Sequence, residues 1–308
     1  MMKTLMRLTT AAVVAAAFTS ASATSGNADW RQKYKTIKIG AVQVESQGAT
    51  LTRYKPLSAY LKSKLGVDVE IFTASDYAGI VQALAGGNIH LGRMGGAAYA
   101  AAYLDTKGSI EPLVMNVEPD GGKGYNSILI VNSDSSYKQL EDLKGKTLAW
   151  ADPNSTSGFL VPSVALRENG IDPDKFFGRT LFAGGHEPGV VGVLKKNFDA
   201  AFTWTSPGHK AGQLRIMMDR NMLKLDDIRI IWKSPLIPNP IWAIPSSIPK
   251  DMKEELSKVF LGMAKDNMKM AEAAAWGKTS GFIPATHEMY ATIVKVAEEK
   301  RKNRRKKN

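Results

Sequence analysis

Short β-type runs alternate with helical patterns along most of this chain, and this order limits the fold more than any other feature. Thr36–Val44 alternates polar and apolar residues as a strand does, and Leu51–Leu65 then places apolar residues at helical spacing. Strand-like Val67–Phe72 and Ile89–Met94 follow, each with a helical segment after it. Strands that alternate with helices favour a mostly parallel sheet with helices on both faces. The chain is therefore predicted to be an α/β protein.

The pattern starts again in the middle of the chain, which predicts a second α/β unit. Tyr125–Val131 is a strongly apolar strand, and strands and helices alternate after it as far as Ile228–Lys233. We expect a first lobe made of residues 24–131 and 234–308, with residues 132–233 inserted as the second lobe. The two named runs would be strands that cross between the lobes and form a hinge beside a ligand cleft. One continuous α/β domain is the alternative.

The remaining elements follow from the same periodicities. Four helices are expected in the second lobe and two near the C-terminus, at Tyr137–Leu143, Gly158–Asn169, Pro188–Lys196, Gly208–Met222, Lys250–Ala264 and His287–Lys302. Further strands are expected at Ile110–Val117, Lys146–Ala151, Arg179–Phe182, Ala200–Trp204 and Ile241–Ile244.

The first 23 residues have the pattern of a secretory signal peptide. Lys3 and Arg7 supply a positive n-region, Leu8–Phe18 is a short apolar run, and Ala21-Ser22-Ala23 is a small-residue site that predicts cleavage after Ala23. A membrane anchor is the alternative, but the run is about half of the ~20 apolar residues that a spanning helix needs. The chain has no cysteine, which excludes disulfides, thiolate chemistry and a lipid anchor on a cleavage-site cysteine. We expect a free periplasmic protein.

The formal net charge of +12 is concentrated at the two ends of the chain. Two of the positive charges belong to the predicted signal peptide, and residues 300–308 carry seven more. A terminal basic run of this kind is usually a solvated or disordered tail. Nucleic-acid binding is not expected of an exported protein, and contact of the tail with anionic lipid headgroups is the alternative.

The segment Asp152–Pro162 (DPNSTSGFLVP) follows a predicted strand and opens a predicted helix. A helix N-terminus presents unpaired N–H groups and the positive end of the helix dipole. Ser155, Thr156 and Ser157 add hydroxyl donors, and Gly158 lets a ligand approach the backbone closely. These features favour a receptor for a tetrahedral oxyanion, whereas ordinary N-capping is the alternative interpretation.

A second loop, Gly184–Gly189, contains His186 and follows the neighbouring predicted strand. The carboxyl ends of adjacent parallel strands meet at one edge of a sheet, so we expect His186 beside the hydroxyl-rich loop. A histidine there can donate a hydrogen bond to an oxyanion, more strongly if it is protonated. The other three histidines have no comparable context and receive no role.

Several segments together resemble the periplasmic phosphonate-binding proteins of ABC transporters, a group with phosphite- and hypophosphite-binding relatives. The resemblance covers roughly residues 36–290 and lies in Asp152–Pro162, Gly185-His186-Glu187, Trp232–Pro238 (WKSPLIP), Asp76–Ile80 (DYAGI) and Glu45-Ser46-Gln47. It implies a two-lobed type II periplasmic-binding-protein fold, which closes on a small phosphorus oxyanion and delivers it to a permease in the inner membrane. It also implies that Ser155, Thr156, Ser157 and His186 hold the phosphonate oxygens, with the Tyr77 hydroxyl added from the first lobe.

This chain departs from the family pattern at Arg93-Met94-Gly95, where relatives often have an aromatic pair before the glycine. The second aromatic is usually a tyrosine that touches the anion, and Met94 cannot repeat that hydrogen bond. We expect Arg93 or Tyr99 to compensate, or the pocket to be reshaped, and we include Arg93 and Gly95 among the ligand-binding residues.

The second departure concerns the substituent on phosphorus. Relatives that bind aminoalkylphosphonates surround the ammonium group with carboxylates, but residues 203–207 and 238–240 contain no Asp or Glu. A buried cation without a counter-charge binds poorly. Trp204 therefore indicates a small or apolar substituent, such as methyl or hydrogen, and we predict weak binding of 2-aminoethylphosphonate.

An enzyme on the same fold is the rival class. No Ser-His-Asp spacing, metal-ligand cluster or phosphate-binding P-loop is recognised, and Asp120–Gly124 lacks the GxxxxGK[ST] spacing. The sequence therefore predicts no catalytic residue, no metal and no cofactor. A periplasmic sensor subunit for the same ligand is a further alternative that the sequence leaves open.

Overall fold

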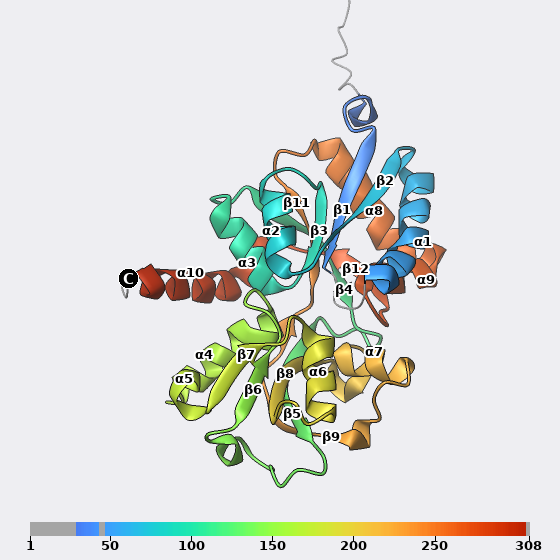
Figure 1. Cartoon of the computed structure of the whole chain (residues 1–308). Coiled ribbons are helices and arrows are strands. Elements are labelled where there is room, and N and C mark those ends of the chain that lie inside the picture. Colours follow the sequence, from blue (N-terminus) through green and yellow to red (C-terminus); the bar gives the residue numbers. More distant parts are fainter. Residues whose placement is uncertain (1–28, 43–46, 306–308) are drawn as a thin grey trace, which may run out of the picture.

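The structure, a computed structural model, describes residues 29–42 and 47–305. These residues form two mixed six-stranded sheets, each covered by helices, and the two resulting lobes lie one above the other in Figure 1. The predicted two-lobed α/β architecture is confirmed. The predicted signal peptide with Ala23, and Glu45-Ser46 of the motif quoted above, lie outside the described residues.

The sheet of the first lobe has the order β12-β4-β11-β3-β1-β2. Its strands are β1 (Thr36–Val42), β2 (Asp68–Ala74), β3 (Leu91–Met94), β4 (Ile110–Val117), β11 (Ile241–Pro245) and β12 (Gly281–Pro284). Strand β1 is parallel to β2 and β3, whereas β11 is antiparallel to β3 and β4, and β12 is antiparallel to β4. The prediction of a mostly parallel sheet is wrong for this half, because β11 re-enters the lobe from the opposite direction after the chain has passed through the second lobe.

The sheet of the second lobe has the order β10-β5-β8-β6-β7, and β9 also pairs with β5. Its strands are β5 (Gly124–Asn132), β6 (Thr147–Trp150), β7 (Arg179–Phe182), β8 (Ala200–Thr205), β9 (Ile228–Lys233) and β10 (Ile237–Pro238). Strands β5 and β9, which the sequence predicted as crossing strands, are members of this sheet, and β5 has paired neighbours on both sides. The passages between the lobes are residues 118–123 and 239–240.

Helices cover both sheets. The first lobe has α1 (Gln47–Leu65), α2 (Tyr77–Ala85), α3 (Gly96–Asp105), α8 (Lys250–Asp266), α9 (Met268–Ala275) and α10 (Ala291–Arg305). The second lobe has α4 (Val161–Glu168), α5 (Pro173–Phe176), α6 (His186–Leu194) and α7 (Gln213–Asp219).

Two predicted helices are shorter than expected. Tyr137–Leu143 reduces to a 3-10 turn at Leu140–Leu143. In Gly208–Met222 only α7 is α-helical, because Gly208 (φ 69°) and Gly212 (φ 100°) adopt left-handed backbone conformations that interrupt a helix. A Cβ on Gly212 would also lie 2.7 Å from the Thr205 Cα, so this glycine allows the chain to turn closely past the end of β8.

The cores explain why each sheet is covered on both faces. In the first lobe Leu57 and Leu61 of α1 are buried together with Ile37 and Ile39 of β1. In the second lobe β5 is buried throughout except for its last residue, so its side chains pack into separate hydrophobic clusters on the two faces. Each fully buried aliphatic side chain contributes about 1.5–3 kcal/mol relative to exposure. This burial holds the loops at the strand ends on rigid supports.

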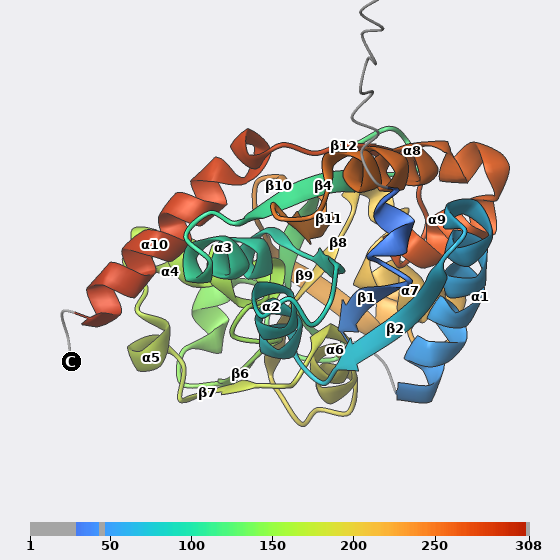
Figure 2. The same ribbon diagram turned by 90° about the horizontal axis from the view of Figure 1, so that it is seen from above.

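Helix α10 packs against α3, and in the view of Figure 2 its far part passes over α4 of the second lobe, where Lys300 contacts Ser163. The Lys300 Nζ lies 3.7 Å from the centroid of the Phe159 ring, and Arg301 forms an ion pair with Asp105 at 2.8 Å. Residues 300–305 continue the helix, so a disordered tail is wrong for them, whereas exposed Lys302 and Asn303 agree with a solvated one. No helix in the described part of the chain combines the length and hydropathy that a membrane span requires.

Candidate functional site

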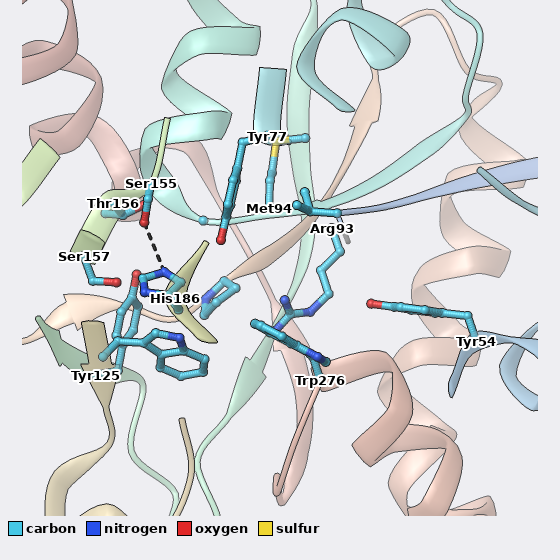
Figure 3. Close-up of a pocket in the computed structure, with 14 residues that line it drawn as sticks. Tyr54, Tyr77, Arg93, Met94, Tyr125, Ser155, Thr156, Ser157, His186 and Trp276 are labelled. Carbon is cyan, nitrogen blue, oxygen red and sulfur yellow. Dashed lines mark hydrogen bonds between the residues drawn. The ribbon is translucent and has the colours of Figure 1, made fainter. Parts of the chain in front are cut away.

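A small pocket lies where the two lobes meet, with a cavity volume of about 40 Å³. The structure brings together all eight residues that the sequence proposed for a site, and each lines this pocket: Tyr77, Arg93, Gly95, Ser155, Thr156, Ser157, His186 and Trp204. Figure 3 shows the Ser155–Ser157 loop facing the Tyr77 hydroxyl across the pocket. Since a cavity of roughly 10–15 Å³ on this measure holds one water molecule, this one has room for only a few heavy atoms.

The loop after β6 is shaped by its own hydrogen bonds. The Asp152 carboxylate accepts the Asn154 N–H at 2.6 Å, and Ser155 Oγ accepts the Gly158 N–H at 3.0 Å. Residues Thr156–Leu160 form a π-helical turn that leads into α4, so the helical backbone starts two residues earlier than predicted. The amides of Thr156 and Ser157 open this turn and have no carbonyl one turn earlier to receive them. They remain donors for a ligand.

His186 is the first residue of α6 and is 3% exposed. Its Nε2 lies 3.1 Å from Ser155 Oγ and its Nδ1 lies 3.3 Å from Thr203 Oγ1. Burial lowers the pKa of His186 to about 3, so the imidazole is neutral at physiological pH. The stronger hydrogen bond of a protonated ring, considered from the sequence, is therefore not available in this environment.

The first lobe closes the pocket through the ends of β3 and α2. The Asp76 carboxylate caps α2 by accepting the Gly79 N–H at 2.8 Å, which places Tyr77 at the pocket wall, and burial raises the pKa of its phenol. Across the cleft the Ala97 N–H donates to Thr156 Oγ1 at 2.9 Å. A Cβ on Gly95 would lie 2.7 Å from the same oxygen, so only glycine permits this contact between the lobes.

Arg93 is held by the end of α9. Its Nε donates to the Ala274 carbonyl at 3.1 Å, its Nη2 donates to the Ala275 carbonyl, and its guanidinium lies 5.6 Å from the centroid of the Trp276 ring. Tyr99, considered from the sequence as a substitute donor, cannot act in this way here. Its hydroxyl contacts His287 Nδ1 at 2.7 Å, and its buried ring packs in the core rather than at the pocket.

Three aromatic residues that were not predicted from the sequence also line the pocket: Tyr54, Tyr125 and Trp276. The Tyr125 hydroxyl is in hydrogen-bonding reach of Thr156 and Ser157, and burial raises its pKa to about 12. Tyr54 fitted the apolar face of a helix, and Tyr125 fitted an apolar strand. A sequence feature that could have indicated a site role for Tyr125 is the preceding Gly124, which lies where the chain enters the second lobe.

No Asp or Glu belongs to the pocket lining within the described residues. However, the carboxyl group of Glu118 is in hydrogen-bonding reach of Ser206 and Asn239, two positions where the sequence analysis found no acid. Glu118 is 2% exposed, and burial raises its pKa to about 7. It lies in the first passage between the lobes.

Comparisons with known proteins agree on one family. The family model described as "ABC transporter, phosphonate, periplasmic substrate-binding protein" matches residues 39–290. An Escherichia coli protein named phosphonates-binding periplasmic protein is 32% identical over 252 residues, which cover 80% of this chain and 72% of that protein. A Mycolicibacterium smegmatis protein named phosphate-import protein PhnD is 28% identical over 276 residues, 83% of each chain.

Solved structures show the same similarity. A binding-protein component of an ABC phosphonate transporter from Pseudomonas aeruginosa has a TM-score of 0.74 and 29% identity, over 85% of both chains. PhnD1 from Prochlorococcus marinus, solved in complex with methylphosphonate, has a TM-score of 0.75 and 21% identity, over 87% of this chain and 99% of that one. At that identity the second structure is a match of fold.

Proposed function

The chain belongs to the periplasmic phosphonate-binding proteins of ABC transporters, and on this basis we propose that the pocket between its lobes captures a small alkylphosphonate or phosphite for import. The observation that carries the proposal is the hydroxyl- and amide-lined loop of residues 155–158, buried at the pocket and faced by Tyr77. The small cavity supports a ligand with a short substituent.

The binding mechanism follows from the donors around the pocket. A tetrahedral oxyanion would accept hydrogen bonds from the Ser157 hydroxyl and from the amides at the start of the π-helical turn. The Tyr77 and Tyr125 hydroxyls would add bonds from the opposite walls. Each hydrogen bond to a charged ligand contributes about 1.5–3 kcal/mol. Three to five such bonds, less the costs of ordering and desolvation, correspond to roughly micromolar to nanomolar affinity.

Closure of the cleft completes the site. The ligand would dock first on the loop of the second lobe, and Tyr77 and Gly95 would then arrive with the first lobe. The hydrogen bond from Ala97 to Thr156 joins the anion loop directly to the start of α3 and so links the two lobes beside the pocket. Closure of this kind is the usual behaviour of two-lobed binding proteins.

Ser155→Ala and His186→Ala are each expected to weaken methylphosphonate binding by about tenfold or more, because each removes a hydrogen-bonding group that orders the anion loop. Isothermal titration calorimetry of the mature protein measures the dissociation constants, and thermal melting verifies that the variants fold. His209→Ala is the matched control, since His209 contacts Thr205 Oγ1 outside the pocket lining. Unchanged affinity in both pocket variants would remove these side chains from the site.

Titration with methylphosphonate, phosphite and 2-aminoethylphosphonate tests the class of substituent. The amino compound is expected to bind most weakly, because its ammonium group would enter a pocket that has an arginine and tryptophans where a counter-charge is needed. Tightest binding of 2-aminoethylphosphonate would refute this expectation and point to Glu118 as the counter-charge.

The proposed cellular location and partners follow from the family and the N-terminal sequence. We propose that the chain is exported, cleaved after Ala23 and released in the periplasm, where it delivers its ligand to an inner-membrane permease. The matched relatives are named as binding and import proteins, which supports a receptor rather than an enzyme. A sensor subunit for the same ligand remains the second candidate, and its test is whether neighbouring genes encode a permease and an ATPase.

A further inference from the structure

Arg93 presents a half-buried positive charge at the wall of the pocket opposite the anion loop. Figure 3 places its guanidinium between Tyr54 and Trp276, on the opposite side of the pocket from Ser155–Ser157. Two of its nitrogens are occupied by carbonyl groups at the C-terminal end of α9. These two hydrogen bonds, together with the Trp276 ring, fix the direction of the guanidinium.

The groups around Arg93 do not neutralise it. Among the described residues no carboxylate forms an ion pair with its guanidinium; its polar partners are the two carbonyls. The phenols of Tyr54, Tyr77 and Tyr125 surround it, and burial raises the pKa of each, so they are uncharged at neutral pH. Arg53 on α1 adds charge of the same sign, and Glu118 is only partly ionised near pH 7.

The anion loop adds no full positive charge. Its donors are hydroxyls and amides, and His186 is neutral because burial lowers its pKa. Arg93 is thus the one full cation among the described residues that line the pocket. A buried charge is costly unless a partner compensates it, and the partner that this geometry leaves open is the ligand.

We infer that Arg93 selects doubly ionised phosphorus oxyanions with an uncharged substituent, in preference to monoanions of the same shape such as alkylsulfonates and to zwitterionic aminoalkylphosphonates. This inference rests on the proposed function, because it assigns a ligand class to the same pocket. A dianion gains more from a fixed guanidinium than a monoanion does, whereas an ammonium substituent is repelled by it.

The experiment compares methylphosphonate with methanesulfonate, which has the same shape and one charge fewer. Calorimetric titrations use the mature wild-type protein, Arg93→Met and Arg93→Lys. Loss of the charge in Arg93→Met is expected to weaken methylphosphonate binding by about 30-fold and methanesulfonate binding by only about fivefold, because the Coulomb energy is proportional to the ligand's charge. Arg93→Lys retains the charge and is expected to keep most of the preference for the phosphonate.

A purely structural role gives a different result. If Arg93 only ties β3 to α9, the Met and Lys variants lower both affinities by the same factor and reduce the melting temperature alike. That outcome would overturn the inference while leaving the proposed function intact. If the wild-type protein binds neither methylphosphonate nor phosphite, the proposed function itself fails.

The wild-type protein provides a second test that needs no variant. Its affinity for methylphosphonate is expected to rise with pH as the ligand loses its second proton near neutral pH. Methanesulfonate keeps one charge throughout, so it reports any titration of protein groups such as Glu118. Parallel pH profiles for the two ligands would contradict a preference for the dianion.

Discussion

Gly158→Ala is expected to weaken phosphonate binding by about 100-fold, one of the two largest effects that this structure predicts. A Cβ at this position would lie 2.3 Å from the Ala151 Cβ, 2.8 Å from Ser155 Oγ and 3.0 Å from His186 Cε1. All three contacts are shorter than van der Waals separation, and the new methyl group can be accommodated only if the anion loop moves away from β6. Such a movement displaces Ser155 and breaks its contact with His186 of α6.

Titration calorimetry with methylphosphonate measures this loss. Gly262→Ala is the matched control, because Gly262 lies in α8 and a Cβ there meets no atom within 4 Å. The control is expected to bind normally and to melt at a slightly higher temperature, since alanine is a better helix former than glycine. Wild-type affinity in Gly158→Ala would show that the loop is not held against β6 as described.

Glu118→Gln is expected to remove most of the pH dependence of folding stability between about pH 4.5 and pH 8. The carboxyl is buried, its Oε2 has no hydrogen-bond partner within the described residues, and the same is true of Asn239 Oδ1. Burial and the nearby negative charge of Asp120 raise the pKa of Glu118 to about 7 from 4.5, whereas Ser206 and Asn239 act to lower it.

The sign of the effect follows from this raised pKa. The folded state holds the proton more tightly, so the stabilisation is complete below pH 4.5 and is lost as the pH rises through about 7. The loss approaches about 3 kcal/mol in the unfolding free energy at high pH. Urea unfolding at several pH values measures it. Glu254→Gln, which removes an exposed carboxyl that pairs with Lys250 on α8, should retain the wild-type dependence. A Glu118→Gln variant that also retained it would refute the assignment.

The sequence predicted the anion loop well, because its hydroxyls, glycine and helix start are contiguous and each has a local physical reason. The three missed aromatic residues could not be found in this way. Tyr54, Tyr125 and Trp276 come from three distant segments, and each has a residue type that an apolar core also favours. Only the folded chain shows that their polar or π-electron faces meet at one cavity.

The fold was predictable where periodicity was clear and less so where strand direction mattered. Alternating strands and helices predicted two α/β lobes, but a sequence pattern carries no information on whether β11 pairs in parallel or antiparallel orientation. The sheet membership of β5 was equally hidden, since a buried apolar strand is compatible with a hinge or with a central position. In the predicted helix at 208–222, Gly208 and Gly212 were a local sequence signal that the helix is interrupted.

The contact of Lys300 with Phe159 has a practical consequence for labelling this protein. Helix α10 belongs to the first lobe, whereas Phe159 follows Gly158 in the anion loop of the second, so any widening of the cleft shifts one past the other. A fluorescent dye on the exposed Lys302 of α10 is therefore expected to report opening of the cleft in real time.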